Sequence, residues 1–350
     1  MFPDQEDARG VLQNKYGIKD IIGLKPLPSY EDQNFHVTAK VADDLQHDYI
    51  LKIMNNALSK NPDICSVQSH AMAFLRECGF PTPMTFPTTG GEMLSFFSVD
   101  LDSDQGSDYI VRLLEYMPGV PLSKVVVQSD MFYKLGNLTA FMNLTLQVPF
   151  CITVVTLHLA IKCIKCVLMP LLEVLNGNPI KKLVCDVLQV CTSSLLPKLP
   201  YCRLIHGDLN DYNILVEECM EENYKISGII DFSDLFPGYY MSELAILMVY
   251  TMGNHPEKMM VGGHVIAGYE SVMPLTAEEK DSLFFIVVSR LASSIVLCQH
   301  TARNTLKNTQ YLFVHYSSIC NLLQDLWEAG KEKVEELWFD VVDLYSSKLN

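Results

Sequence analysis

A short polar loop between two apolar runs carries the side chains best suited to chemistry. Residues 204–216 contain His206, Asp208 and Asn213 in the pattern His-x-Asp-x-x-x-x-Asn. A carboxylate in such a loop can orient a hydroxyl group and accept its proton, and an asparagine oxygen can hold Mg²⁺ against nucleotide phosphates. The spacing and the flanking strands predict phosphoryl transfer, with Asp208 as the catalytic base and Asn213 as a metal ligand.

A second acidic loop supplies a further metal ligand. The apolar run from Ile226 to Ile230 is typical of a strand and ends at Asp231, where kinases carry a carboxylate that binds Mg²⁺. The alternative is that both loops are polar turns on a surface hairpin. Because the full pattern is more specific than three separate residues, we interpret Asp231 as a metal ligand.

Composition limits the classes of protein that the chain can belong to. The 350 residues carry a net charge of −15 and are 49% hydrophobic, without a long run of Lys and Arg. Binding to nucleic acid through neutralisation of phosphates is therefore not expected. A sizeable core is expected, in one large domain or in two lobes.

The N-terminus and the cysteines predict where the protein resides. Residues 1–10 are acidic and show neither the apolar stretch of a secretory signal nor an arginine-rich transit peptide. Eleven cysteines are scattered without a framework, which favours reduced thiols. We expect a cytoplasmic protein.

The first third of the chain is typical of a small nucleotide-binding lobe. Alternating apolar and polar residues predict strands over 34–41, 48–54, 92–99 and 108–116, and a helix begins at Asn61-Pro62 and stops at Gly79. We predict an α+β protein with a bilobal, protein-kinase-like fold. A small N-terminal lobe with an antiparallel sheet spans residues 1–116, and a larger, mainly helical C-terminal lobe spans residues 117–350.

Lys52 is predicted to bind the nucleotide phosphates. It lies in an apolar strand between Leu51 and Ile53, as the phosphate-binding lysine of kinases does; alternatively, it reaches water from a sheet edge. Kinases pair this lysine with a glutamate on the next helix, but Gln68 fills the expected position. A neutral amide cannot balance the charge of an ammonium group, so the counter-charge for Lys52 is left open.

Two further segments are candidates for nucleotide binding. The turn that contains Ser29 and Asn34 would lie over the phosphates, although it lacks a glycine-rich pattern and could be an ordinary turn. The linker that contains Glu115 and Met117 leads into a Pro-Gly turn and would supply backbone hydrogen bonds to a purine. Backbone contacts leave the choice between ATP and GTP open.

The larger lobe contains one atypical segment. Residues 148–172 form an apolar run about long enough to span a bilayer, but His and Lys residues interrupt it and Pro170 ends it. We expect a buried helix or an irregular insert rather than a membrane span. Cys163 and Cys166 form a C-x-x-C pair, and the lack of a second pair with comparable spacing argues against a structural zinc site.

Several motifs together are typical of one family of kinases. They are Pro28-Ser29-Tyr30-Glu31-Asp32-Gln33-Asn34-Phe35-His36-Val37, Leu51-Lys52-Ile53, Asn61-Pro62-Asp63, His206-Gly207-Asp208-Leu209-Asn210-Asp211, Asn213-Ile214-Leu215, Gly238-Tyr239-Tyr240 and Gly262-Gly263-His264-Val265. With them, residues 16–147 and 171–348 resemble the aminoglycoside phosphotransferase-like small-molecule kinases, and within these the hydroxylysine kinase family. Gln68 also fits this narrower family.

The resemblance implies a specific reaction, which composition and spacing do not reach. It implies GTP-dependent phosphorylation of the 5-hydroxyl group of free 5-hydroxy-L-lysine in lysine breakdown, with ATP as the other possible donor. It also implies that Asp208 is the base, that Asn213 and Asp231 hold Mg²⁺, and that Lys52 binds phosphate.

Three further carboxylates are candidates for the substrate site. Asp211, Asp234 and Glu243 would suit an acceptor that carries two amines. Asp211 and Asp234 could equally be solvated turn residues. Ser242-Glu243 could be an N-terminal cap of the next helix.

The resemblance fails over residues 148–169, where related sequences carry a polar, aromatic-containing segment. We interpret the apolar, cysteine-rich run here as an altered splice product or a wrong exon choice, which could remove part of the substrate wall. Three hypotheses follow: a hydroxylysine kinase, a kinase of another amino alcohol such as choline, ethanolamine or homoserine, and an inactive variant that keeps nucleotide binding. The presence of both Asp208 and Asp231 argues against the third.

Overall fold

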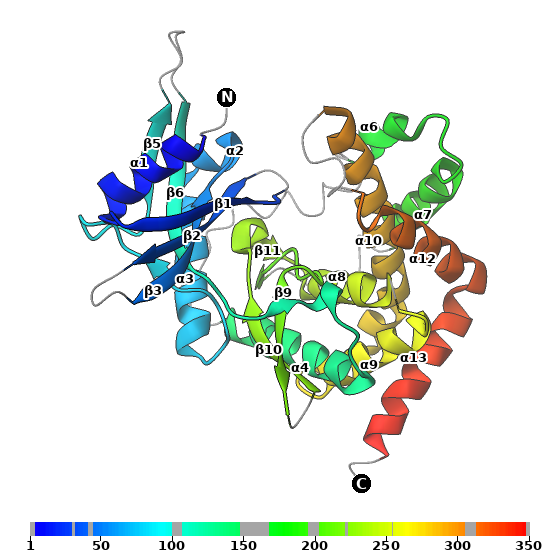
Figure 1. Cartoon of the computed structure of the whole chain (residues 1–350). Helices are drawn as coiled ribbons and strands as arrows, with labels where there is room; N and C mark the ends of the chain where they lie inside the picture. The colour runs from blue at the N-terminus through cyan, green and yellow to red at the C-terminus, as the bar shows by residue number, and fades with distance from the viewer. Residues whose placement is uncertain are drawn as a thin grey trace. The chain divides into compact units, whose positions relative to one another are not determined.

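A computed structural model describes most of the chain. The described residues are 4–29, 32–40, 45–99, 107–147, 168–194, 203–220, 223–253, 255–304 and 313–347. The chain divides into two compact units: unit 1 comprises Met1–Pro118 and Ser227–Ser233, and unit 2 comprises Gly119–Ile226 and Asp234–Asn350. Figure 1 labels most of the helices and strands. The division predicted between residues 116 and 117 is close to the first of these boundaries, but the short segment Ser227–Ser233 groups with unit 1.

Unit 1 contains an antiparallel sheet of six strands in its described part. The strands are β1 (Ile21–Leu27), β2 (Gln33–Lys40), β3 (Gln46–Ile53), β4 (Thr85–Phe86), β5 (Ser95–Val99) and β6 (Ser107–Glu115). Their order is β1-β2-β3-β6-β4, and β5 pairs with β6 off this path. In the register, Lys52 lies opposite Asn34 on one side and opposite Arg112 on the other. These three side chains therefore share one face of the sheet.

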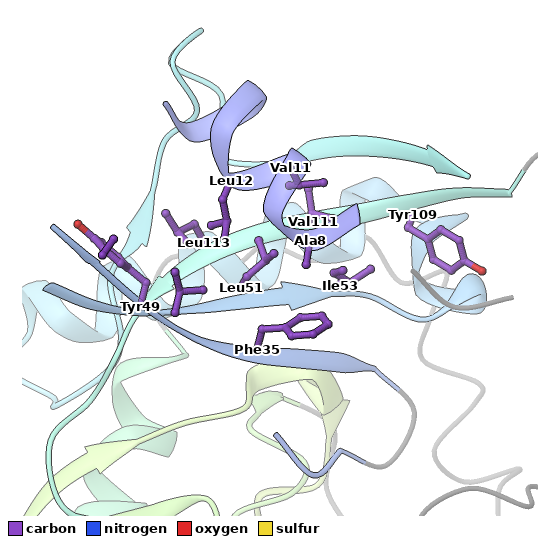
Figure 2. Close-up of a cluster of buried hydrophobic side chains, with 12 residues drawn as sticks. Ala8, Val11, Leu12, Phe35, Tyr49, Leu51, Ile53, Tyr109, Val111 and Leu113 are labelled. Atoms are coloured by element: carbon purple, nitrogen blue, oxygen red, sulfur yellow. The ribbon is translucent and has the colours of Figure 1, made fainter. Parts of the chain in front are cut away.

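The opposite face of the sheet is apolar and is covered by the first helix. Helix α1 (Gln5–Tyr16) begins at Asp4, which forms a capping box with Asp7, and ends at Gly17 in the left-handed conformation. As Figure 2 shows, α1 directs Ala8, Val11 and Leu12 toward apolar side chains of the strands. Burial of a side chain such as Val11 or Leu12 contributes about 1.5–3 kcal/mol to the core, and this packing supports the sheet that carries Lys52.

The face that carries Lys52 is bordered by the short helix α2 (Asn56–Ser59) and by α3 (Pro62–Glu77). Pro62 occupies the first turn of α3, the helix ends at Cys78, and Gly79 has a positive φ, as the sequence predicts. Cys65 of α3 packs with Met54 and Ile110. The helix therefore lies against the sheet at the level of Lys52.

Unit 2 contains two small sheets that hold the polar loops. A three-stranded sheet has the order β10-β9-β7, and a two-stranded sheet pairs β11 with β8. The strands are β7 (Val120–Pro121), β8 (Arg203–Ile205), β9 (Ile214–Cys219), β10 (Asn223–Ile229), which continues into unit 1, and β11 (Phe236–Gly238).

The rest of unit 2 is mainly helical. The helices are α4 (Ser129–Thr145), α6 (Met169–Leu171), α7 (Lys181–Ser194), α8 (Tyr240–Gly253), α9 (Lys258–Glu270), α10 (Ala277–Asn304), α12 (Tyr316–Ala329) and α13 (Lys331–Ser346), with short 3-10 turns at Leu122–Lys124 and Leu172–Leu175. A third 3-10 turn, Phe232–Asp234, begins in unit 1 and ends in unit 2. The backbones of α4 and α9 touch, because a Cβ atom at Gly268 would lie 1.8 Å from the Tyr133 carbonyl oxygen. The α+β fold with a small antiparallel sheet lobe and a larger helical lobe is confirmed.

The structure does not test the prediction of a buried helix or an irregular insert in the atypical apolar segment. Residues 148–167, which include the Cys163/Cys166 pair, lie outside the described residues. Among the described helices, α10 alone is long and apolar enough to cross a membrane, and 61% of its most apolar window is buried within the fold. Core helices of globular proteins meet the same test, so this is weak evidence for a span.

Candidate active site

The loop between β8 and β9 places the His-x-Asp-x-x-x-x-Asn motif at the end of a buried strand. β8 is paired in antiparallel register with β11, and His206 and Leu209 are buried beneath the loop. Within the loop, Asn210 Oδ1 accepts hydrogen bonds from the backbone N–H groups of Tyr212 at 2.8 Å and Asn213 at 3.0 Å. This turn, which asparagine side chains favour, fixes the backbone between the predicted base and the predicted metal ligand.

Asp208 is held by two amides and keeps an exposed edge. Its Oδ2 accepts hydrogen bonds from Asn210 Nδ2 at 2.8 Å and from Asn213 Nδ2 at 3.1 Å. Its Oδ1 lies 3.6 Å from Arg290 Nη2, and about a quarter of its side chain is exposed (26%). The two amide hydrogen bonds therefore fix the orientation of this carboxylate in the loop.

Asn213 is oriented as a metal ligand should be. Its Nδ2 also donates to the Asp208 backbone oxygen at 2.8 Å, so both amide hydrogens are directed to Asp208. The planar amide therefore turns Oδ1 away from Asp208. An amide oxygen of this kind is a suitable ligand for Mg²⁺, and the predicted role of Asn213 fits the local geometry.

The loop requires glycine at position 207. Gly207 has φ of +85°, and a Cβ atom there would lie 2.1 Å from the backbone oxygen of Asp234. Its N–H donates to Glu243 Oε2 at 3.1 Å. Backbone conformation and close approach together exclude a larger residue, so Gly207 docks the loop against the segment that leads into β11.

The structure places Glu243, a candidate for the substrate site, inside the fold. Glu243 is fully buried (0% exposed) in the first turn of α8, and it accepts from the loop backbone at Gly207. Burial raises the pKa of Glu243, while His206 and the loop N–H groups oppose this shift. Glu243 therefore holds the catalytic loop in place. Asp234, in contrast, is exposed and stays a candidate for substrate binding.

Asp211 also faces the protein rather than solvent. It is 5% exposed, its backbone oxygen accepts from Ser123, and its Oδ1 lies 3.2 Å from His315 Nε2. The rings of Tyr212 and Tyr250 meet His315 edge-on, with centroids 5.1 Å and 5.4 Å away. Asp211 therefore contacts the His315 ring inside the fold, and this contact supports the loop.

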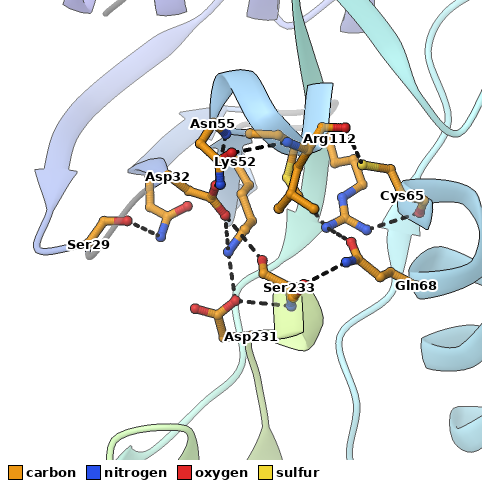
Figure 3. Close-up of polar contacts among 12 residues, drawn as sticks. Ser29, Asp32, Lys52, Asn55, Cys65, Gln68, Arg112, Asp231 and Ser233 are labelled. Atoms are coloured by element: carbon orange, nitrogen blue, oxygen red, sulfur yellow. Dashed lines mark hydrogen bonds and ion pairs between the residues drawn. The ribbon is translucent and has the colours of Figure 1, made fainter. Parts of the chain in front are cut away.

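In unit 1, Lys52 is a buried cation between two carboxylates, as Figure 3 shows. Its Nζ lies 2.7 Å from Asp231 Oδ1 and 3.1 Å from Asp32 Oδ2, and the residue is 4% exposed. Burial opposes the charged form, but Asp231 and Asp32 outweigh it and raise the pKa of Lys52 above its ordinary value. The ammonium group thus stays charged, as phosphate binding requires.

Asp32 is the counter-charge that the sequence left open. It comes from the segment between β1 and β2, and its Oδ1 also accepts from the backbone and side-chain nitrogens of Asn55, at 2.9 Å and 3.0 Å. Ser233 Oγ donates to its other oxygen at 3.1 Å. With both oxygens occupied, Asp32 fixes Lys52 from the side of the sheet rather than from the helix.

Gln68 has a different partner from the one expected. Its Oε1 accepts from Arg112 Nη2 at 3.1 Å, and its Nε2 donates to the Ser233 backbone oxygen at 2.8 Å. Arg112 is buried (1% exposed) next to Lys52 in the sheet, and burial lowers its pKa. The neutral Gln68 side chain therefore accepts a hydrogen bond from Arg112, a second buried cation, and links it through a hydrogen bond to Ser233.

Asp231 has the strained backbone that functional sites often show. It is one of two described non-glycine residues with positive φ, at +63°, which costs about 1–3 kcal/mol. Its side chain is 39% exposed. A carboxylate held by Lys52 in a strained, partly exposed position suits the predicted role of metal ligand, since Mg²⁺ prefers carboxylate oxygens and keeps part of its water shell.

The remaining nucleotide candidates are only partly available for binding. Asn34 Nδ2 donates to Ser29 Oγ at 3.4 Å, so the two residues face each other across the turn. The Glu115 N–H donates to the Met84 backbone oxygen and its carboxylate pairs with Arg76, which leaves the Glu115 carbonyl as its group for a purine. Met117 follows β6 and is nearly buried (9% exposed).

The described residues do not by themselves form a complete metal site. In the part of the chain that the structure describes, no three His, Cys, Asp or Glu side chains gather into a metal cage. The amide oxygen of Asn213 and the carboxylate of Asp231 are each hard-oxygen donors, the kind of ligand that Mg²⁺ prefers.

A sheet that presents a carboxylate-paired lysine, and a strand–loop–strand unit that presents Asp208 and Asn213, define a kinase-like phosphotransferase. The sequence profile of the phosphotransferase enzyme family matches residues 23–279, and the chain belongs to this family. It is an enzyme that transfers phosphoryl groups to an alcohol.

The relatives are named for one acceptor. Hydroxylysine kinase from Bos taurus is 36% identical over 98% of this chain and 94% of the relative. Hydroxylysine kinase from Danio rerio is 36% identical over 94% of this chain and 93% of the relative.

Solved structures share the fold. An aminopropanol kinase associated with a microcompartment has a TM-score of 0.71 at 19% identity and covers 93% of this chain and 98% of its own. An amicoumacin kinase in complex with AMP-PNP, Ca²⁺ and Ami has a TM-score of 0.66 at 16% identity, over 92% of this chain and 94% of its own. At such identities these structures support the fold alone.

Some residues of the site were missed by sequence reasoning. Asp32 lies inside a family motif, but nothing in the sequence assigns it to Lys52. Arg290 interrupts the apolar run of α10, and this interruption was the available signal for a functional cation. Arg112 had no recognisable signal, because a single arginine in a strand is usually exposed.

Proposed function

We propose that this phosphotransferase transfers the γ-phosphoryl group of GTP to the 5-hydroxyl group of free 5-hydroxy-L-lysine. The observation that carries the proposal is the Asp208 carboxylate, held by Asn210 and Asn213 with one oxygen toward solvent and Arg290. Similarity to hydroxylysine kinases over nearly the whole chain supports the choice of acceptor.

In the proposed reaction, Asp208 orients the acceptor hydroxyl group and takes its proton. The hydroxyl oxygen forms a bond to the γ-phosphorus, while the bond from that phosphorus to the oxygen bridging to the β-phosphate breaks. The nucleoside diphosphate leaves with the electron pair of the broken bond. Because little covalent chemistry falls to the protein, positioning and charge stabilisation supply most of the rate.

Lys52 is proposed to bind the nucleotide phosphates, with Asp32 keeping its ammonium group charged and fixed. Bound Mg²⁺ would neutralise charge on the phosphates, and Asn213 and Asp231 would hold the ion. The turn with Ser29 and Asn34 and the linker with Glu115 and Met117 are proposed to contact the rest of the nucleotide. GTP is proposed as the donor on the family resemblance, with ATP as the alternative.

We also propose that the protein works in the cytoplasm. The structure shows no disulfide among the cysteines that it describes, which supports a reducing compartment. Cell fractionation with an antibody against the protein would test this, and recovery from a secreted or membrane fraction would contradict it.

The test of the function is a transfer assay with separate donors and acceptors. Purified protein with Mg²⁺ is given GTP or ATP, and 5-hydroxy-L-lysine, homoserine, choline or ethanolamine; lysine serves as the acceptor without a hydroxyl group. We expect nucleoside diphosphate to form with 5-hydroxy-L-lysine, with GTP as the better donor. The Asp208→Asn variant should lose about 10²–10⁴-fold in turnover, which is what general bases contribute.

Two outcomes would change the proposal. Preferred turnover of choline, ethanolamine or homoserine would make the chain a kinase of another amino alcohol. A folded protein that binds GTP but phosphorylates none of these acceptors would indicate an inactive variant, with residues 148–169 as the segment to replace by its counterpart from a relative.

A further inference from the structure

Arg290 lies beside the candidate catalytic carboxylate of Asp208 but at a longer distance than a hydrogen-bonded ion pair. Its Nη2 is 3.6 Å from Asp208 Oδ1, longer than the about 2.8 Å of a charge-assisted hydrogen bond. Its Nε is buried and has no hydrogen-bond acceptor among the residues that the structure describes. A guanidinium group has five N–H donors in a planar fork. Arg290 directs part of this fork to the Tyr250 side chain and to Asp208, and the N–H groups left over can bind a ligand.

The surroundings hold Arg290 charged and in place. Its Cζ lies 5.9 Å from the centre of the Tyr250 ring. Burial opposes the charged form, but Tyr250, Asp208 and Asp234 outweigh it and raise the pKa of the guanidinium. On α10 its neighbours Val287 and Leu291 are fully buried, which anchors the backbone. The side chain is 27% exposed, so part of it is accessible to a ligand from solvent.

We propose that Arg290 binds the carboxylate of an amino-acid acceptor and so selects amino acids over amino alcohols. This inference rests on the proposed function, because 5-hydroxy-L-lysine carries an α-carboxylate that choline and ethanolamine lack. The planar fork of arginine matches a carboxylate in two parallel hydrogen bonds. An acceptor whose only charged groups are amines would not need a positively charged arginine in its site, whereas a carboxylate would.

The distances allow one acceptor to contact both residues. In extended 5-hydroxy-L-lysine, the 5-hydroxyl oxygen and the carboxylate carbon are roughly 6 Å apart, from bond lengths near 1.5 Å. Asp208 Oδ1 and Arg290 Nη2 are 3.6 Å apart. With a hydrogen bond of about 2.8 Å at each end, the acceptor can span the pair without stretching, while its amines point toward the exposed Asp234.

The test compares acceptors that differ only in the carboxylate. 5-Hydroxy-L-lysine is paired with 1,5-diaminopentan-2-ol, and homoserine with 3-aminopropan-1-ol, for the wild type, Arg290→Gln and Arg290→Lys. We expect Arg290→Gln to lower kcat/KM for 5-hydroxy-L-lysine about 100-fold, mainly through KM, as loss of one partner of a charge pair does. For 1,5-diaminopentan-2-ol the change should stay within about threefold. Arg290→Lys should recover about tenfold, since it keeps the charge but not the fork.

A matched control separates the site from the helix. Arg303→Gln removes the same charge from an exposed position in the last turn of α10, and it should leave both acceptors unchanged. Thermal melting of each variant identifies any that fail to fold. Equal losses on both acceptors of a pair would overturn the proposal, because Arg290 would then act through Asp208 or through the fold.

The design also keeps failure of this inference apart from failure of the proposed function. If the wild type prefers homoserine, and Arg290→Gln removes its advantage over 3-aminopropan-1-ol, Arg290 binds carboxylates although the proposed acceptor is wrong. If the wild type prefers the partner without a carboxylate in both pairs, the inference is wrong. If no acceptor is turned over, calorimetric binding of the same pairs to the wild type and Arg290→Gln decides by the same comparison.

Discussion

Replacing Asp32 by asparagine should disconnect Lys52 without changing the size of the side chain. Asp32 Oδ2 accepts from Lys52 and Ser233, and Oδ1 accepts from two nitrogens of Asn55. In either orientation of an asparagine amide, its NH₂ group would face hydrogen-bond donors, either Lys52 and Ser233 or the two nitrogens of Asn55. The substitution therefore removes a charge and also creates a buried clash between donors.

The structure sets the size of the effect. The Lys52 and Asp32 side chains are only 5% and 6% exposed, and breaking a buried ion pair costs about 3–5 kcal/mol. Because Asp231 remains 2.7 Å from Lys52, we expect a smaller loss, about 2–3 kcal/mol in the free energy of unfolding. The displaced ammonium group should also raise KM for the nucleotide about tenfold, one decade per 1.4 kcal/mol of lost binding.

Urea unfolding and nucleotide kinetics would measure the two effects. Asp20→Asn is the control, since Asp20 is an exposed aspartate in the same unit and should change neither quantity. An Asp32→Asn protein with the unfolding midpoint and nucleotide KM of the wild type would refute the assignment of Asp32 as the counter-charge of Lys52.

Two further substitutions test the support of the catalytic loop. Gly207→Ala places a Cβ atom 2.1 Å from the Asp234 carbonyl oxygen and should destabilise the fold by about 3 kcal/mol in urea unfolding, whereas Gly10→Ala, with open space around it, should not. The raised pKa of Glu243 means that its stabilisation is complete below the ordinary carboxyl pKa and is lost as pH rises through the raised value. Relative to Glu243→Gln, wild-type stability should fall with rising pH; a pH-independent difference would contradict the burial argument.

The fold and the core of the site could be predicted because their signals are local. Strand β2 shows alternating burial, α3 begins at a proline and ends before a glycine, and the turn between Asp208 and Asn213 folds through hydrogen bonds between residues at most five positions apart. Such features depend on short-range geometry, which a single sequence contains.

The sequence could not predict the surroundings of polar residues whose burial depends on distant parts of the chain. In the sequence, Glu243 and Asp211 look like candidates for binding an amine. In the structure, Glu243 contacts the Gly207 backbone and Asp211 contacts His315, inside the fold. The partner of Lys52 was sought on α3, whereas the pairing comes from Asp32 across the sheet. A buried and an exposed carboxylate look alike in sequence, because only tertiary packing distinguishes them.

The central claim is that Asp208 accepts the proton of an acceptor hydroxyl group during phosphoryl transfer. The most direct test is to incubate the wild type and Asp208→Asn with GTP, Mg²⁺ and 5-hydroxy-L-lysine and to identify the product by phosphorus NMR. We expect phosphate on the 5-oxygen with the wild type, and a loss of about 10²–10⁴-fold with Asp208→Asn while GTP binding is retained. Undiminished turnover by Asp208→Asn would contradict the account.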